Sequence, residues 1–228
     1  MSTPHSFRVF LVLLSYFMVF SAKAEDWQLV RDKSDIQVFT QQVEGSKFKR
    51  AKAVTRVKAD LATLVNFLQD SDNFPKWMWG AKETKSLKNI SRSEKLTYNV
   101  TSVAWPQKDR DSIVHSHWER DSKSQVMRHV FTSEPSYLPS DSSMQRVGRQ
   151  EGEWRLRPVG NGEVEVTFVS FVDMGKDAPN WLVKQIAMDM PFESLKKLRE
   201  IPKDQYRSGA LDLIQQIPEQ AIIDSTRS

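Results

Sequence analysis

Alternating apolar and polar positions predict that most of this chain folds into β-strands. From residue 50 to residue 57, odd positions carry small or apolar side chains and most even positions carry basic ones. This period of two places one strand face in the core and the other in water. Such runs predict strands over residues 27–31, 36–43, 48–57, 82–89, 93–103, 112–120, 125–133, 153–159 and 164–174.

Two segments have a helical period instead. Apolar residues three and four positions apart, from Leu61 to Leu68, follow Asp60 and predict a short helix. A longer helix should begin at Asp177, a candidate N-cap, and end near residue 201. Pro191 lies in its middle, and we expect a kink there because proline removes a backbone hydrogen bond.

The order of these elements predicts an α+β fold. Gly160-Asn161-Gly162 separates the last two strands and supplies the positive φ angles of a tight hairpin. One helix cannot cover a flat sheet of so many strands, so the antiparallel sheet should curl around the C-terminal helix.

The first 24 residues have the pattern of a secretory signal peptide. Arg8 precedes an almost wholly apolar run over residues 9–20, and Ala22-Lys23-Ala24 matches the A-x-A cleavage pattern. The alternative is a membrane anchor, but the run is shorter than the ~20 residues that a spanning helix requires. We expect an exported protein, periplasmic or secreted.

The remaining composition fits one domain over residues 25–203, followed by an extension and tail over residues 204–228. Without Arg8 and Lys23, the 33 basic side chains fall to 31 against 29 acidic ones, mixed along the chain. No basic block is therefore available to bind nucleic acid. The chain has no cysteine, which excludes disulfides, zinc-thiolate sites and thiol chemistry.

Two stretches resemble a known family, the START (StAR-related lipid-transfer) domains. The motif with which one strand of these domains begins is similar to Trp105-Pro106-Gln107-Lys108-Asp109-Arg110-Asp111-Ser112-Ile113-Val114. The C-terminal half of these domains is similar to Gly152-x-Trp154-x-Leu156-x-Pro158, then Pro179-x-Trp181-Leu182 and Leu195-x-x-Leu198-Arg199. The resemblance covers about residues 27–201 and implies a helix-grip fold that encloses a lipid-sized tunnel. The signal peptide and Ser112 depart from the animal pattern, so the identity of the ligand does not carry over.

Long and aromatic side chains suit the adaptable apolar wall of such a cavity. We expect it to be lined by Tyr98, Val100, Trp118, Met127, Phe131, Trp154, Phe168, Trp181, Met188 and Phe192. Each buried methylene group of a ligand contributes ~0.8 kcal/mol, so binding needs no catalytic group. The alternative is that these side chains pack against one another and leave no cavity.

Arg110 and Asp111 are the candidate polar residues of the cavity, with Arg110 as the expected head-group ligand. A buried charge needs a partner, and the two could also bind each other. A second hypothesis is an enzyme acting on an apolar substrate, with these two residues and His115 or His117 as acid and base. The sequence has no G-x-S-x-G, H-E-x-x-H, Walker or G-x-G-x-x-G motif.

The histidines allow one metal-site hypothesis. If the turn after residue 121 contains two residues, His117 opposes Arg128, and His129 points to the opposite sheet face. A one-residue change of register would bring His129 beside His115 and His117, as in a three-histidine site. No carboxylate or fourth ligand accompanies them, so we expect no metal and no cofactor.

Trp77, Met78 and Trp79 stand in an aromatic segment that we expect to be a loop. Exposed, they could enter a membrane interface during ligand exchange, with Lys76 and Lys82 near phosphates. Buried, they would cap one end of the sheet, and this interpretation is favoured.

Taken as one chain, these features favour a monomeric carrier or sensor of a hydrophobic small molecule. We expect the ligand to be a lipid, bound without covalent chemistry and exchanged through transient membrane contact. An interaction module whose cavity has closed is a third hypothesis.

Overall fold

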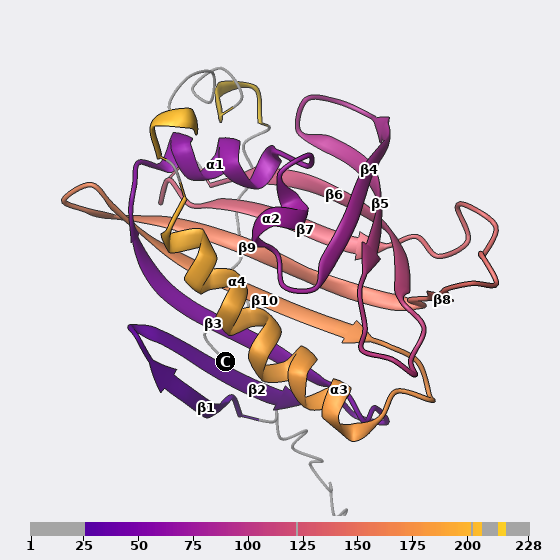
Figure 1. Cartoon of the computed structure of the whole chain (residues 1–228). Coiled ribbons are helices and arrows are strands. Elements are labelled where there is room, and N and C mark those ends of the chain that lie inside the picture. Colours follow the sequence, from indigo (N-terminus) through magenta and orange to yellow (C-terminus); the bar gives the residue numbers. More distant parts are fainter. Residues whose placement is uncertain (1–25, 122, 202, 207–213, 218–228) are drawn as a thin grey trace, which may run out of the picture.

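The computed structural model describes residues 26–121, 123–201, 203–206 and 214–217. Its strands are β1 (Gln28–Lys33), β2 (Ile36–Gln42), β3 (Lys49–Lys58), β4 (Ala81–Asn89), β5 (Glu94–Thr101), β6 (Arg110–Arg120), β7 (Met127–Ser133), β8 (Gln145–Arg146), β9 (Arg149–Gly160) and β10 (Glu163–Asp173). The described strands form one sheet in the order β1-β2-β3-β10-β9-β7-β6-β5-β4, and β8 pairs with β6 (Figure 1). The predicted antiparallel arrangement is confirmed, apart from the short parallel β8.

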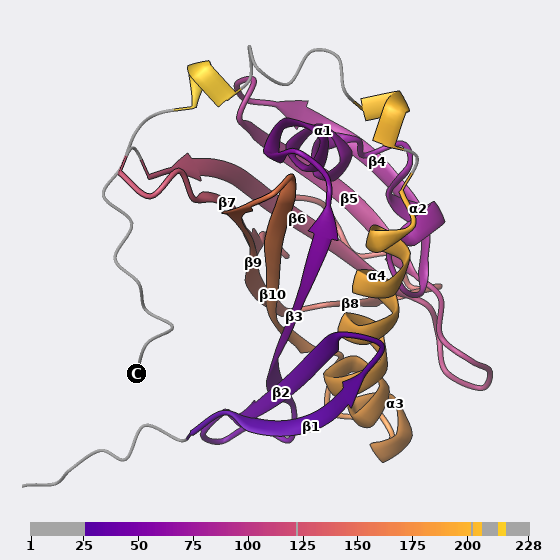
Figure 2. The same cartoon turned by 90° about the vertical axis from the view of Figure 1, so that its left-hand side faces the viewer.

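The helices are α1 (Leu61–Gln69), α2 (Phe74–Trp77), α3 (Asn180–Lys184) and α4 (Met190–Arg199). The sheet curls, and α3 and α4 run along its concave side (Figures 1 and 2). The α+β helix-grip prediction is confirmed. In the part of the chain described, no helix is long and apolar enough to cross a membrane.

Strand β3 shows why the C-terminal helix can lie so close to the sheet. Its odd positions Ala51, Ala53 and Val57 are almost fully buried, as the alternation predicts. Small side chains there leave room for α4, which packs against β2 and β3. Leu195 and Leu198 of α4 fill that space and are fully buried, so the grip is made of large residues on the helix and small ones on the sheet.

The first helix begins as predicted, because the Asp60 carboxylate accepts a hydrogen bond of 2.7 Å from the Thr63 backbone N–H. The segment expected to be a loop contains the short helix α2 instead. Its Trp77 is 5% exposed and lies between Phe67 and Trp154, with ring centroids 5.0 and 5.6 Å away. The interpretation of this segment as part of the core is therefore confirmed for Trp77, while Met78 and Trp79 are half-buried against the core.

The long C-terminal helix is interrupted by a π-helical turn, Gln185–Asp189, between α3 and α4. The Met190 N–H donates to the carbonyl of Gln185, five residues back. Pro191 follows in the first turn of α4 and has no N–H to donate. The predicted break near Pro191 thus takes the form of a wider turn.

One predicted boundary needs correction, because the N-cap of α3 is Pro179 and Asp177 makes no cap there. The signal peptide and most of the C-terminal extension and tail lie outside the described residues, and a short 3-10 turn covers Lys203–Tyr206. The Gly160-Asn161-Gly162 hairpin is confirmed, with φ of 86°, 53° and 70°.

Candidate ligand-binding cavity

A cavity of about 130 Å³ lies between the sheet, α2, the π-helical turn and the start of α4. An engineered apolar cavity of about 150 Å³ binds benzene, so a volume of about 130 Å³ accommodates roughly six carbon atoms. In this conformation the cavity has room for one short hydrocarbon chain of a ligand.

One wall of the cavity is apolar and rich in aromatic rings. The rings of Trp154 on β9 and Phe168 on β10 stack with centroids 4.0 Å apart and an interplanar angle of 10°. These residues are direct partners in the β9–β10 register, which explains the stacking. Ile186, Met190 and Trp79 complete this wall from the helix side. The rigid rings of the sheet thus face the flexible side chains of Ile186 and Met190.

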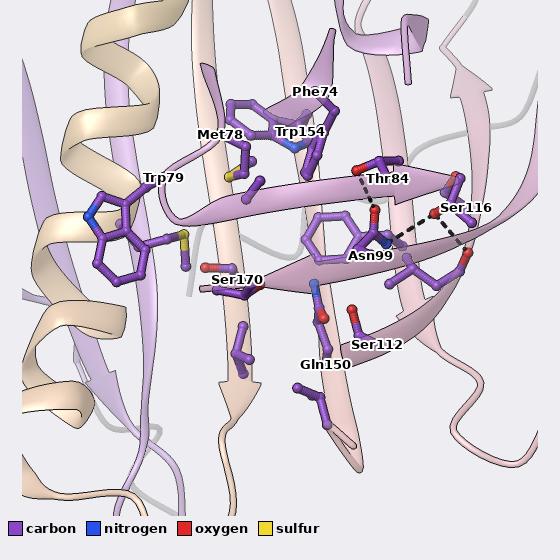
Figure 3. Close-up of a pocket in the computed structure, with 18 of the residues that line it drawn as sticks. Phe74, Met78, Trp79, Thr84, Asn99, Ser112, Ser116, Gln150, Trp154 and Ser170 are labelled. Atoms are coloured by element: carbon purple, nitrogen blue, oxygen red, sulfur yellow. Dashed lines mark hydrogen bonds between the residues drawn. The ribbon is translucent and has the colours of Figure 1, made fainter. Parts of the chain in front are cut away.

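The opposite wall is polar and comes mainly from β4, β5 and β6 (Figure 3). Thr84 donates to Asn99 Oδ1 at 3.0 Å, and Asn99 donates to Thr97 Oγ1 at 3.2 Å. The hydroxyl groups of Ser112 and Ser116 face the same space, and within the described residues neither forms a hydrogen bond. This wall can therefore offer hydrogen bonds to a ligand.

A cationic group lies at the end of the polar wall. Lys95 of β5 is 8% exposed, and its ammonium donates to the Gln69 carbonyl at 2.8 Å and to Ser71 Oγ at 2.6 Å. Burial lowers the pKa of Lys95 to about 8, and the carboxylates of Asp70 and Asp72 oppose that shift. Lys95 therefore remains mostly protonated at neutral pH.

His129 of β7 lines the cavity beside this end. Its ring stacks on Trp118 with centroids 4.7 Å apart. Burial lowers the pKa of His129 to about 3, and the nearby Lys95 and His117 act in the same direction. His129 is therefore neutral and can either donate or accept a hydrogen bond.

The structure brings Phe131, Trp154 and Phe168 together at the cavity. The other predicted lining residues lie elsewhere, so the predicted set is corrected to that extent. Tyr98 and Val100 occupy the outer face of β5, where Tyr98 Oη donates to the Met144 sulfur at 3.8 Å. Trp118, Met127, Arg110, Trp181, Met188 and Phe192 are likewise absent from the lining.

Each of these residues has another environment. Trp118 donates from Nε1 to the Gln69 side chain at 2.8 Å, and Met127 is fully buried in the core. Trp181 is 41% exposed on α3. Phe192 packs under the Arg31 guanidinium, 4.7 Å from its ring centroid.

The predicted acid and base groups lie away from the cavity. Asp111 is paired with Arg146 of β8 at 2.8 Å, and does not bind Arg110. Arg110 donates to the carbonyl of Met174 at 3.4 Å and to the side chain of Gln107 at 3.0 Å. Both are buried as parts of the framework at the entry to β6.

His115 and His117 occupy the outer face of β6, where each pairs with a glutamate. The β6–β7 register differs from the predicted one, because His117 opposes Val130 and Trp118 opposes His129. The connection runs to Val126, with Gln125 at φ 57°, and is longer than two residues. His129 therefore points to the opposite face, and the described residues include no cluster of three metal-binding side chains.

Sequence reasoning missed the polar wall. Its signal is the alternation Lys95, Thr97, Asn99, Thr101 along β5, which resembles a solvent-exposed strand face. That face points into the cavity instead, while the apolar face of β5 is covered from outside.

A curled antiparallel sheet that closes around a C-terminal helix and an internal cavity defines the helix-grip class. The chain belongs to the START domain family, whose pattern matches residues 19–205. An uncharacterized protein of Pseudomonas aeruginosa is 35% identical over 179 residues, covering 78% of this chain and 88% of that protein.

Two solved structures share the fold. The STAR-related lipid transfer protein from Xanthomonas axonopodis has a TM-score of 0.70 and 30% identity, covering 76% of this chain and 97% of its own. Human STARD10 has a TM-score of 0.70 and 19% identity, covering 86% of this chain and 84% of its own. The second similarity concerns the fold alone.

Proposed function

We propose that this protein holds a lipid in the cavity and carries or senses it without covalent chemistry. The START family assignment supports binding of a hydrophobic ligand, and the Xanthomonas relative is described as a lipid transfer protein. The observation that carries the proposal is the pairing of an aromatic wall with a hydroxyl and amide wall. Such a cavity can accommodate both the chain and the polar part of an amphiphile.

The placement of the histidines supports a non-enzymatic role, and Lys95, whose pKa of about 8 is near neutral pH, has no carboxylate beside it among the described residues that line the cavity. Acid–base catalysis needs a group with a pKa near the working pH within hydrogen-bond reach of the substrate. His129 faces the cavity, but its pKa of about 3 keeps it neutral. His115 and His117 are on the opposite face of the sheet, bonded to Glu94 and Glu119.

Native mass spectrometry of protein purified from its own cells tests this function. We expect a mass increment that solvent extraction removes and that lipid analysis identifies as an amphiphile. Protein that carries no ligand, and cannot be loaded from any lipid mixture, would contradict the proposal.

We further propose that the chain is exported and works in the periplasm or outside the cell. The support is the charged, apolar and small-residue order of residues 8–24. N-terminal sequencing of protein recovered from cell fractions should give a mature chain beginning near residue 25.

Membrane contact during ligand exchange is proposed at the end of the molecule that carries Trp105. Trp105 is 91% exposed in the β5–β6 connection, and Lys108 of the same connection donates to the Ser142 carbonyl at 2.8 Å. Indole rings favour membrane interfaces. This assignment replaces Trp77, which is buried.

Trp105→Ser is expected to weaken binding to phosphatidylglycerol-containing vesicles about tenfold in co-sedimentation, because an interfacial indole is lost. Ile90→Ser is the matched control. Ile90 is 46% exposed at the opposite end of β5, and its loss should leave vesicle binding unchanged. Equal effects of both variants would argue against this contact surface.

A further inference from the structure

The ammonium of Lys95 is held in place but not neutralised. Its two hydrogen bonds go to uncharged oxygens, those of the Gln69 carbonyl and the Ser71 hydroxyl. Across the described part of the chain, no carboxylate forms an ion pair with it. An ammonium has three N–H donors, so one donor remains available beside the cavity.

Other donors surround this position. Ser116 is the direct cross-strand partner of Lys95, and its hydroxyl faces the cavity without a hydrogen bond to the described residues. The neutral His129 imidazole lines the same end. The two oxygens of a carboxylate would match this small set of donors, with Lys95 supplying the charge.

The space beyond this position suits an extended chain. Successive register partners run from Lys95 and Ser116 to Phe131 and Gly152, and on to Ser170 of β10. Phe131 and Ser170 line the cavity, so this row of residues leads from Lys95 past the Phe131 ring to the apolar wall. Four strand spacings separate β5 from β10 in the sheet, about 19 Å.

We propose that the Lys95 end of the cavity binds the carboxylate of a single-chain fatty acid, whose chain lies along the aromatic wall. This inference rests on the proposed function and narrows its ligand to a monocarboxylate. The cavity volume of about 130 Å³ favours one chain over two. A single free ammonium donor favours a carboxylate over a phosphate, which has more oxygens to satisfy.

The test compares decanoate with decanol, which have the same chain length and differ in the charge of the head group. Affinities are measured calorimetrically at pH 7 for the wild type, Lys95→Met and Lys88→Met. Lys95→Met should lower the decanoate-to-decanol affinity ratio about 30-fold, as expected for loss of a charged hydrogen bond. Lys88→Met, an exposed site on the β4 edge strand, should leave the ratio unchanged.

A second measurement on the wild type covers the case in which Lys95→Met does not fold. Decanoate affinity should fall as the pH rises above about 8, where Lys95 loses its proton in the free protein. The charged or titratable groups near Lys95 are Asp70, Asp72 and His129, and burial keeps the pKa of His129 at about 3, outside this pH range. Decanol affinity should stay constant over this range.

The outcomes separate this inference from the proposed function. Decanol could bind while the decanoate-to-decanol affinity ratio changes neither with Lys95→Met nor with pH. This result would overturn the fatty-acid assignment and leave the proposed lipid binding intact. Failure of both ligands to bind the wild type would count against both proposals. If Lys95 only terminated α1, its replacement would lower thermal stability without changing the ratio.

Discussion

Replacing Gly152 with alanine should destabilise the protein by ~3 kcal/mol, at the upper end of the usual cost of overpacking. A Cβ atom at this position would overlap the Val169 carbonyl oxygen and lie 2.6 Å from Phe131 Cζ and 2.9 Å from Ser170 Cα. The Phe131 ring could rotate away, but the two backbone atoms belong to the neighbouring strand β10. The strands β9 and β10 would have to separate at the centre of the sheet.

Thermal unfolding followed by circular dichroism measures this effect, and the midpoint should drop by roughly 6–12 °C. Gly148→Ala is the matched control, because a Cβ atom there meets nothing within 4 Å. Its stability should equal that of the wild type or rise slightly, since alanine restricts the unfolded chain. A Gly152→Ala midpoint within 2 °C of the control would disprove close packing of β7, β9 and β10 here.

The parts of the fold that follow from local patterns could be predicted from the sequence. Strand β3 alternates cleanly because its outer face is wet and its inner face meets α4. The Asp60 N-cap and the Gly160-Asn161-Gly162 hairpin depend only on neighbouring residues. Such signals fix elements and their order, and together with the family resemblance they define the helix grip.

The faces of β5 could not be assigned in the same way. Its apolar side, with Val100 4% exposed, is covered from outside, while its hydroxyl and amide side faces the cavity. Burial of an apolar residue under a loop and burial under a helix give the same sequence pattern. The polar lining therefore resembles an ordinary wet face until the tertiary structure is known.

The predicted lining residue of the C-terminal helix, Met188, is wrong for a different reason. The prediction takes the segment from Asp177 to Ile201 as one regular α-helix, in which Met188 faces the cavity. The π-helical turn Gln185–Asp189 adds one residue to a turn and rotates the following residues by about 100°. In a regular helix Met188, seven residues before the buried Leu195, would share its inner face, but the wider turn rotates the two apart. Ile186 and Met190, four residues apart, line the cavity, and Met188 does not.

Met190→Arg is therefore expected to abolish ligand loading. Met190 is 6% exposed and lines the apolar wall, where a guanidinium would lose its hydration without finding a carboxylate. Decanol affinity should fall by at least ~30-fold in calorimetric titration. Met190→Trp provides a second variant that stays apolar, and it should reduce loading by filling the cavity if the arginine variant does not fold.

Met188→Arg is the matched control, two residues away in the same helix. Met188 is only half-buried and does not line the cavity, so its arginine can reach water and decanol affinity should stay within about threefold of the wild type. The two variants make opposite predictions for a regular helix and for one with a π-helical turn. Greater loss in Met188→Arg than in Met190→Arg would mean that the helix keeps its regular phase and that the cavity has a different roof.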